Sequence, residues 1–321
     1  MINCTENYEM DKCLSVIIPS YNEELMIGKT AKTITEILEE NGIEAELLFI
    51  DDGSRDSTWE KIREAASAYD NVRGIHFSRN FGKEAAIYAG LSYSAGDCAV
   101  VIDCDLQHPP AKIVEMYRLW EQGYEVIEAV KADRGRESAF HAFCAHTFYS
   151  IISSATGIDM SRASDFKLLD RKAVLALLNM REKNAFFRAL SSWIGFKTTQ
   201  VEFEVQEREA GESKWSTRSL IRYAMTNITS FSTAPMQIVT VLGILMLINA
   251  FVFGTISLIQ KIRGTALGGF TTVILLQLLT GSIVMISLGI IGYYISKIYE
   301  EIKDRPRFIV SEECGRKEKD A

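Results

Sequence analysis

The stretch Val101-Ile102-Asp103-Cys104-Asp105-Leu106-Gln107-His108-Pro109-Pro110 carries the strongest indication of both fold and chemistry. An apolar run over residues 99–102, typical of a buried strand, delivers two carboxylates one residue apart. The proline pair then stops the strand and opens a helix. Carboxylates at this spacing suit a hard divalent cation that also holds a diphosphate. A solvated turn can also hold two aspartates, but the position after a buried strand favours a metal site.

Apolar runs and helical stretches alternate around this motif. The expected strands are 14–18, 47–50, 72–77, 98–102 and 125–130, and the expected helices are 23–40, 57–69, 83–94 and 111–122. Short apolar strands separated by amphipathic helices are typical of a parallel sheet with helices on both faces. The predicted fold class is therefore α/β, with a Rossmann-like, mostly parallel sheet that binds ligands at the carboxyl ends of its strands.

Polar segments follow four of these strands, at 19–23, 51–58, 78–83 and 103–105. Any one of them could be a simple turn, with Ser57 as a helix N-cap or Gly53 as a turn glycine. Four at one edge of a sheet predict a ligand site. The chain has no GxGxxG and no GxxxxGK[ST] motif, which argues against a dinucleotide or P-loop site. Carboxylates that face a nucleotide bind its ribose hydroxyls and base N–H groups, so a metal must neutralise the diphosphate.

The pattern changes after residue 130. Residues 136–154 are expected to be helical, 165–169 to form a short strand, and 201–205 to form a half-exposed strand in which Val201, Phe203 and Val205 alternate with polar residues. Residues 215–231 form a basic amphipathic helix that is expected to lie in a membrane interface, with an ordinary docking helix as the alternative. The charged tail from residue 311 to 321 is expected to be disordered.

Composition restricts the class of protein. The 321 residues are 47% hydrophobic with a net charge of −7, and this acidity argues against a nucleic-acid partner. The six cysteines show no CxxC spacing, which indicates reduced thiols rather than a disulfide framework. Residues 1–12 are polar, so no signal peptide is expected at this end.

Two uncharged apolar stretches, 236–259 and 270–295, predict a membrane hairpin. Each exceeds the roughly 20 residues that a bilayer core requires, and the alternative is a pair of buried core helices. Basic residues flank the hairpin, at Arg218 and Arg222 before it and at Lys297, Lys303, Arg305 and Arg307 after it. They predict that both ends and the catalytic domain are cytoplasmic, although Lys261 and Arg263 in the loop weaken this. The expected organisation is an extension (1–13), a catalytic domain (14–214), an amphipathic helix (215–233), a hairpin (234–296, with spans 236–260 and 270–296) and a cytoplasmic tail (297–321).

At this point the sequence resembles the GT-A glycosyltransferases of family 2, specifically the polyprenyl-phosphate sugar transferases of the bacterial branch with two C-terminal transmembrane helices. The resemblance spans about residues 13 to 308. The motifs that carry it are Ile18-Pro19-Ser20-Tyr21-Asn22-Glu23, Asp51-Asp52-Gly53-Ser54, Asp103-Cys104-Asp105-Leu106-Gln107-His108-Pro109, Ser164-Asp165-Phe166-Lys167 and Arg208-Glu209-Ala210-Gly211-Glu212-Ser213-Lys214.

The resemblance implies a role for each motif. The residues implied to contact the nucleotide sugar are Pro19, Tyr21, Glu23, Asp52 and Asp103, and we add Lys83 from the polar segment that follows the third expected strand. Asp103, Asp105 and Gln107 are implied to hold Mg²⁺ or Mn²⁺. The residues expected to bind phosphate groups are Lys131, Arg134, Arg136, Arg208 and Lys214. The family usually has arginine where this chain has Lys131, which lacks the bidentate fork, and Arg134 and Arg136 are expected to compensate.

The expected catalytic residues are Asp105, Asp165, Arg134 and Lys214. Asp165 is implied to be a base or an orienting carboxylate, with a capping or salt-bridged aspartate as the alternative. A lipid phosphate is already anionic at neutral pH, so its oxygen can attack the anomeric carbon without strong deprotonation. The site then has to supply positioning and charge neutralisation.

The expected function is inverting transfer of a hexose from a nucleotide sugar, UDP-glucose, to undecaprenyl phosphate. The product would be a polyprenyl-monophosphate sugar for modification of cell-surface polymers. The enzyme would be a multi-pass protein of the cell membrane, linked to a flippase and a downstream glycosyltransferase, and its spans and amphipathic helix could support a homo-oligomer. Three alternatives remain: a GDP-mannose-dependent mannosyltransferase, a processive polysaccharide synthase, for which the chain lacks a QxxRW motif, and a membrane-tethered sugar-nucleotide sensor.

Overall fold

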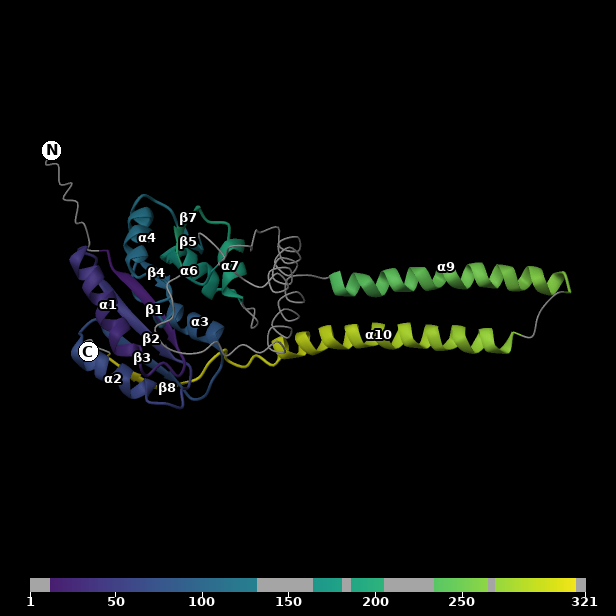
Figure 1. Cartoon of the computed structure of the whole chain (residues 1–321), viewed down its shortest axis with the longest axis horizontal. Helices are drawn as coiled ribbons and strands as arrows, with labels where there is room; N and C mark the ends of the chain where they lie inside the picture. The colour runs from purple at the N-terminus through teal and green to yellow at the C-terminus, as the bar shows by residue number, and fades with distance from the viewer. Residues whose placement is uncertain (1–11, 132–163, 181–185, 205–233, 265–268, 316–321) are drawn as a thin grey trace, which may run out of the picture. The chain divides into compact units, whose positions relative to one another are not determined.

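The computed structural model of the chain describes residues 12–131, 164–180, 186–204, 234–264 and 269–315 (Figure 1). The chain divides into two units, one of Met1–Ser216 with Pro306–Ala321 and one of Thr217–Arg305. The helices expected at 136–154 and 215–231 lie outside the described residues, so both remain predictions.

The first unit is built on one eight-stranded sheet with the strand order β7-β5-β6-β4-β1-β2-β3-β8. Its strands are β1 (Leu14–Ser20), β2 (Ala45–Asp51), β3 (Val72–Phe77), β4 (Cys98–Val101), β5 (Val126–Lys131), β6 (Lys167–Asp170), β7 (Thr198–Phe203) and β8 (Val310–Cys314). Strands β6 and β8 run antiparallel to their neighbours, and the remaining pairs are parallel. The prediction of a mostly parallel α/β sheet is confirmed.

Six helices in the described part of this unit connect the strands. They are α1 (Ile27–Glu40), α2 (Thr58–Ala68), α3 (Lys83–Tyr93), α4 (Ala111–Glu121), α6 (Arg171–Leu178) and α7 (Phe187–Trp193). The first four match the expected helices except at the start of α1, which was expected at Glu23. The Glu23 amide donates instead to Thr58 Oγ1 at 2.8 Å, so residues 23–26 join a loop before the helix begins.

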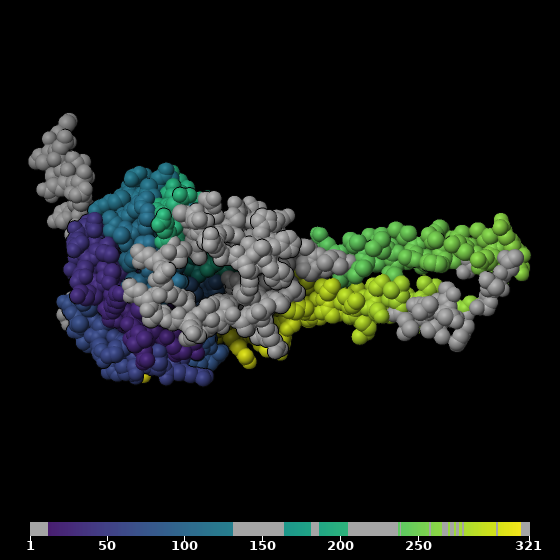
Figure 2. Space-filling view, viewed as in Figure 1, coloured from purple at the N-terminus to yellow at the C-terminus, as the bar shows by residue number. Residues whose placement is uncertain are grey.

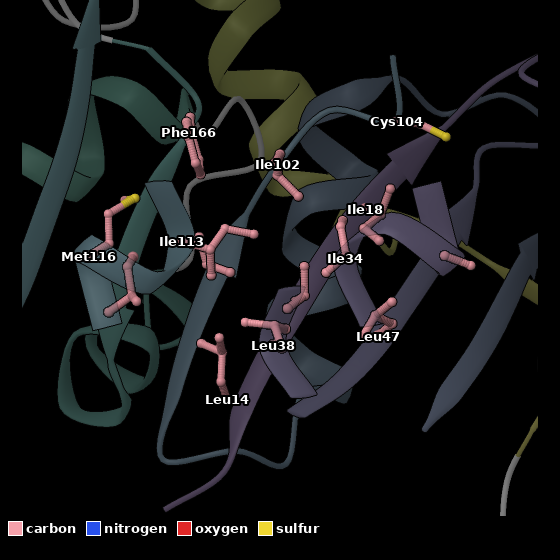
Figure 3. Packing of buried hydrophobic residues seen from close by; sticks show 14 of the residues in the cluster. Leu14, Ile18, Ile34, Leu38, Leu47, Ile102, Cys104, Ile113, Met116 and Phe166 are labelled. Atoms are coloured by element: carbon pink, nitrogen blue, oxygen red, sulfur yellow. The ribbon is translucent and has the colours of Figure 1, made fainter. Parts of the chain in front are cut away.

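Helices cover both faces of the sheet. Apolar side chains of α1, α2 and α4 form one buried cluster with alternate residues of β1 and β2, which Figure 3 shows for Ile18, Ile34, Leu38 and Leu47. Helix α3 packs on the opposite face, where a Cβ on Gly90 would collide with the side chain of Ile17. The period-two alternation of β1 therefore fixes which helix each side chain meets.

The expectation of a disordered tail from Ser311 is wrong for residues 311–314. They belong to β8, which pairs antiparallel with β3 and closes one edge of the sheet. Ser311, Glu312 and Glu313 are exposed. A charged segment can therefore form this strand, because backbone hydrogen bonds hold an edge strand whose side chains stay in water.

The second unit contains α9 (Ala234–Ile262) and α10 (Phe270–Ile302), which lie side by side. Both are long and apolar enough to cross a membrane, over Val239–Ile262 and Leu279–Tyr299, with mean hydropathies of 2.3 and 1.6. Neither stretch is buried inside the structure, and large apolar side chains such as Phe251 and Met285 are exposed on them. Figure 2 shows the two helices in a space-filling view. This exposure fits membrane association and argues against the alternative of two core helices.

Candidate active site

The carboxyl ends of the central parallel strands meet at one edge of the sheet. Ser20 at the end of β1 pairs with Asp51 at the end of β2, and Asp51 pairs with His76 of β3. Strand β4 lies on the other side of β1, with Val101 opposite Ile17. The four polar segments expected at this edge therefore follow adjacent strands, as the sequence predicts.

The loops after β1 and β2 are joined by several hydrogen bonds. The Asn22 amide donates to Ser54 Oγ at 2.9 Å, and Asn22 Oδ1 accepts from the Arg55 amide at 3.0 Å. Asn22 has a positive φ of 53°, an uncommon conformation outside glycine that concentrates at functional sites. Pro19 and Tyr21 are half-buried beside it. The loop that carries Pro19, Tyr21 and Glu23 is thus held in one shape.

Asp52 connects the second loop to the third. Its carboxylate accepts from the backbone amides of Phe81 at 2.6 Å and Gly82 at 2.9 Å. Only 3% of the residue is exposed, and this burial raises the pKa of Asp52 to about 6. Gly53 lies so close to the backbone of Arg79 and Asn80 that no Cβ would fit. The loop at 78–82 is therefore seated against the loop that follows β2.

Lys83, the first residue of α3, bridges two carboxylates. Its Nζ lies 2.6 Å from Asp103 Oδ1 and 2.9 Å from Asp165 Oδ2. Desolvation opposes a charged amine, but Asp103 and Asp165 together raise the pKa of Lys83. The ammonium therefore stays charged between the two aspartates. Lys83 was expected near the nucleotide sugar, and the structure brings it to the first aspartate of the D-x-D motif.

Arg188 of α7 holds Asp165 from the other side. Its Nε and Nη2 donate to the two carboxylate oxygens of Asp165 at 2.6 and 2.9 Å. Burial would raise the pKa of Asp165, but the charges of Lys83 and Arg188 hold it well below its usual value. A carboxylate with so low a pKa is a poor proton acceptor. The geometry favours a salt-bridged, orienting Asp165 over a general base.

Two further polar groups, the half-buried Glu84 and the buried Lys167, extend this network. Glu84 accepts from the Phe187 amide at 2.9 Å, and burial together with the charge of Asp165 raises the pKa of Glu84 to about 7. Lys167 Nζ lies beneath α7, 2.5 Å from Glu128 Oε1 and 2.9 Å from Ser191 Oγ. It also donates to the Arg188 carbonyl at 3.2 Å. Both groups tie α7 to the sheet and to α3, and so fix the position of Arg188.

The sequence reasoning missed Arg188, Glu84 and Lys167 as contributors to the site. The available signal for Arg188 was a lone charge among the apolar residues 186–190. The sequence places Lys167 in a motif but does not indicate its role. Only the folded structure shows that its side chain is 0% exposed and lies beside Glu128. Glu84 lies in an ordinary helical stretch and gives no signal of its own.

The turn of the D-x-D motif carries the oxygen donors expected to hold a metal. Leu106 is buried with a positive φ of 56°, and the Gln107 amide donates to Asp105 Oδ1 at 3.1 Å. Within the described residues, no group of three or more His, Cys, Asp or Glu could hold a metal ion. One or two carboxylates with substrate phosphates are, however, the usual ligands of Mg²⁺. Asp103, Asp105 and Gln107 are oxygen donors of the kind that Mg²⁺ takes together with phosphate ligands.

The partners of Asp103 bear on this fit. Lys83 already occupies Asp103 Oδ1 and its positive charge competes with a cation there, so a metal ion would have to bind through Asp103 Oδ2 or displace the ammonium. On its other side, His108 Nδ1 lies 4.0 Å from Asp103 Oδ2 and has no hydrogen-bond partner among the described residues. The His108 ring is fixed by stacking on Phe166 and by an edge contact with Phe203.

Most of the expected phosphate-binding residues cannot be placed. Arg134, Arg136, Arg208 and Lys214 lie outside the described residues, and so does the strand residue Val205. Lys131 ends β5, but only its backbone is described. Their roles therefore remain predictions from the resemblance.

Known proteins similar to this chain carry the same kind of domain. The family model "Glycosyl transferase family 2" matches residues 15–176. The glycosyltransferase YkcC of Bacillus subtilis (strain 168) is 42% identical over 94% of both chains. A prophage bactoprenol glucosyl transferase homolog of Escherichia coli (strain K12) is 35% identical over 92% of this chain and 98% of its own. The bactoprenol glucosyl transferase of Shigella phage SfV is 34% identical, with 94% and 98% covered. The chain belongs to glycosyltransferase family 2 and is a glycosyltransferase.

Proposed function

We propose that this enzyme transfers glucose from UDP-glucose to undecaprenyl phosphate with inversion at the anomeric carbon. The observation that carries the proposal is the extent of the similarity to bactoprenol glucosyl transferases. It covers 92–94% of this chain and 97–98% of those proteins, so it takes in the apolar hairpin as well as the catalytic unit. Bactoprenol is undecaprenol, whose phosphate is a lipid at the membrane surface.

The donor is proposed to bind at the loops after β1, β2 and β4. Pro19, Tyr21, Glu23 and Asp52 would face the nucleoside, because carboxylate and backbone groups at this edge suit ribose hydroxyls and base N–H groups. Asp103, Asp105 and Gln107 would hold Mg²⁺ or Mn²⁺. When bound, such an ion supplies positive charge for the departing diphosphate. Lys83 supplies a further fixed charge beside Asp103.

The acceptor phosphate is proposed to bind through Lys131, Arg134, Arg136, Arg208 and Lys214. Its oxygen is anionic before it reacts, so attack on the sugar requires no strong base. The low pKa of Asp165 agrees with this, because its carboxylate is engaged by Lys83 and Arg188 and serves to hold them in place. In-line attack then inverts the anomeric centre, and positioning and charge neutralisation supply the rate.

We further propose that α9 and α10 are membrane spans and that the catalytic unit and both termini are cytoplasmic. The basic residues on either side of the hairpin support this orientation. The lipid-linked glucose would then pass to a flippase and a second glycosyltransferase that modifies a cell-surface polymer. Homo-oligomer formation through the hairpin is part of the same proposal.

A donor panel tests the proposed function. Purified full-length enzyme is incubated with undecaprenyl phosphate, Mg²⁺ or Mn²⁺, and either UDP-glucose, UDP-galactose, UDP-GlcNAc or GDP-mannose. We expect lipid-linked sugar from UDP-glucose, with the β-anomer identified by NMR if the donor is α-linked. Asp103→Asn should lose this activity, whereas Glu115→Gln, in an exposed helix pair, should keep it. Faster transfer from GDP-mannose would establish the mannosyltransferase alternative, and donor binding without transfer would establish a sensor.

A further inference from the structure

The segment that follows the second apolar helix returns to the catalytic unit. We call residues 307–314 the C-terminal strap. Its strand β8 pairs with β3 from Gly74 to Phe77, with an irregularity between His76 and Phe77. Ser311 Oγ donates to the His76 carbonyl at 3.2 Å, and the Ser78 amide donates to the Ile309 carbonyl at 3.0 Å. The strap therefore follows β3 to its carboxyl end and reaches the first residue of the next loop.

The strap also contacts helix α3. The Arg307 guanidinium lies over the ring of Tyr88, 4.3 Å from its centroid, and donates to the Met180 carbonyl at 2.7 Å. Tyr88 is buried in the middle of α3, the helix that begins with Lys83. A cation over an aromatic ring is attracted by the negative face of the ring, and more strongly when the contact is shielded from water. The strap thus holds the elements on both sides of the loop at 78–82.

A row of aromatic rings leads from the strap into this loop. Phe308 stacks on Phe77 with centroids 5.2 Å apart and planes 10° apart, and Phe77 meets Phe81 edge-on at 5.8 Å. Phe81 donates its backbone amide to Asp52 at 2.6 Å. Each ring in the row therefore limits the movement of the next, and the last belongs to a residue bound by a donor-site carboxylate.

A second set of contacts runs to the loop after β2. Glu312 of the strap accepts from Trp59 Nε1 at 3.0 Å, and Trp59 stacks on His76 with centroids 5.1 Å apart. His76 Nδ1 lies 2.7 Å from Asp51 Oδ2, and Asp51 Oδ1 accepts from the Ser54 amide at 3.0 Å. The strap is therefore connected to both loops that meet at Asp52.

We propose that the C-terminal strap is a positioning element of the nucleotide-sugar site, with Phe308 and Arg307 as its principal residues. It holds the loop at 78–82 and the start of α3, so that the amides of Phe81 and Gly82 reach Asp52 and the ammonium of Lys83 reaches Asp103. The inference rests on the proposed function only in taking this edge of the sheet as the donor site. It makes donor affinity depend on a segment that follows the apolar hairpin in sequence.

The test compares full-length Phe308→Ala and Arg307→Ala with two controls. Phe308→Tyr keeps the stacked ring. Ile309→Ala truncates a side chain that is 51% exposed and keeps the carbonyl that Ser78 uses. Hydrogen exchange is measured at Phe81 and Gly82, and binding is measured for UDP and GDP with Mn²⁺. Thermal unfolding shows which variants remain folded.

We expect Phe308→Ala and Arg307→Ala to speed exchange at Phe81 and Gly82. The dissociation constant of the nucleotide that wild type binds more tightly should rise about five- to tenfold, as the loss of one aromatic or cation–π contact implies. Phe308→Tyr and Ile309→Ala should stay within about twofold by the same scale. Wild-type exchange and affinity in folded Phe308→Ala and Arg307→Ala would overturn the proposal, as would a lower unfolding temperature with unchanged affinity. Hydrogen exchange in the loop is measured without ligand, so its result does not depend on the proposed function. If the proposed function is wrong, the wild-type enzyme will instead bind a different nucleotide or transfer a different sugar.

Discussion

The bidentate contact between Arg188 and Asp165 offers a direct test of the active-site network. Arg188 donates to both oxygens of Asp165, which is also paired with Lys83. The side chains of Asp165 and Arg188 are 8% and 26% exposed, so water screens this pair only weakly. In Arg188→Ala the Asp165 carboxylate would keep Lys83 as its sole charged partner in the described network. We expect Lys83 to move towards Asp165 and away from Asp103.

The size of the effect follows from these contacts. A hydrogen bond to a charged group contributes about 1.5–3 kcal/mol, and Lys83 compensates for part of the loss. A net loss of about 2–3 kcal/mol in transition-state stabilisation lowers kcat/KM roughly 30- to 150-fold. Arg188→Lys keeps the charge but loses the fork, and we expect an intermediate loss. Arg118→Ala is the control. It breaks an ion pair whose side chains are 49% and 34% exposed, and because such pairs contribute about 0–1 kcal/mol to stability, we expect its kcat/KM to stay close to that of wild type.

The assay is steady-state transfer from UDP-glucose to undecaprenyl phosphate in detergent, with thermal unfolding as the check on folding. A double-mutant cycle with Asp165→Asn separates coupling from general damage. Asp165→Asn also removes the charge that pairs with Lys83, so the double variant should lose about as much activity as Asp165→Asn alone, because the Arg188 contact is already broken in that variant. Wild-type kcat/KM in a folded Arg188→Ala, or losses that simply add in the cycle, would refute the reasoning.

Three further predictions concern the metal, the donor and the core. Asp105→Ala should abolish transfer even with excess Mn²⁺, and EDTA should inactivate wild type; full activity in either case would exclude the metal. Burial raises the pKa of Asp52 to about 6, so its carboxylate takes up a proton as the pH falls below 6 and UDP binding should weaken. Calorimetry should find that the dissociation constant of UDP for Asp52→Asn does not change with pH over this range. Lys167→Met leaves the buried Glu128 without the Lys167 charge, although Ser192 and Gln200 still donate hydrogen bonds to it, at a cost of about 3–5 kcal/mol. Denaturation should show this loss of stability, and adding Glu128→Met should recover most of it.

The part of the fold that could be predicted is the part whose strands are apolar on both faces. Strands β1, β2 and β4 contain apolar runs because helices cover both sides of them, so the sequence located them and the loops that follow. The expected half-exposed strand at β7 is likewise confirmed, since Val201 and Phe203 are buried while Glu202 is exposed. Asp52, Asp103 and Asp105 could be placed at this edge of the sheet because they follow such strands, and their roles remain predictions.

The parts that escaped prediction depend on contacts between distant segments. Strand β8 has exposed, charged side chains, and its order comes from backbone pairing with β3, which lies more than 230 residues earlier in the sequence. Arg188 reaches Asp165 from a separate helix 23 residues away. The left-handed conformation of Leu106 could not be inferred, because leucine carries no preference for it.

The position of β8 after α9 and α10 also has a consequence for biogenesis. The ribosome produces β8 only after both apolar helices, so β3 remains an unpaired edge while the hairpin is being synthesised. Unpaired strand edges are templates for aggregation. Synthesis of the apolar hairpin thus precedes completion of the sheet, and a nascent chain that stalls between residues 264 and 310 would display an open edge to cellular quality control. Shortened chains made for solubility, such as one ending after residue 231, would keep that edge open permanently.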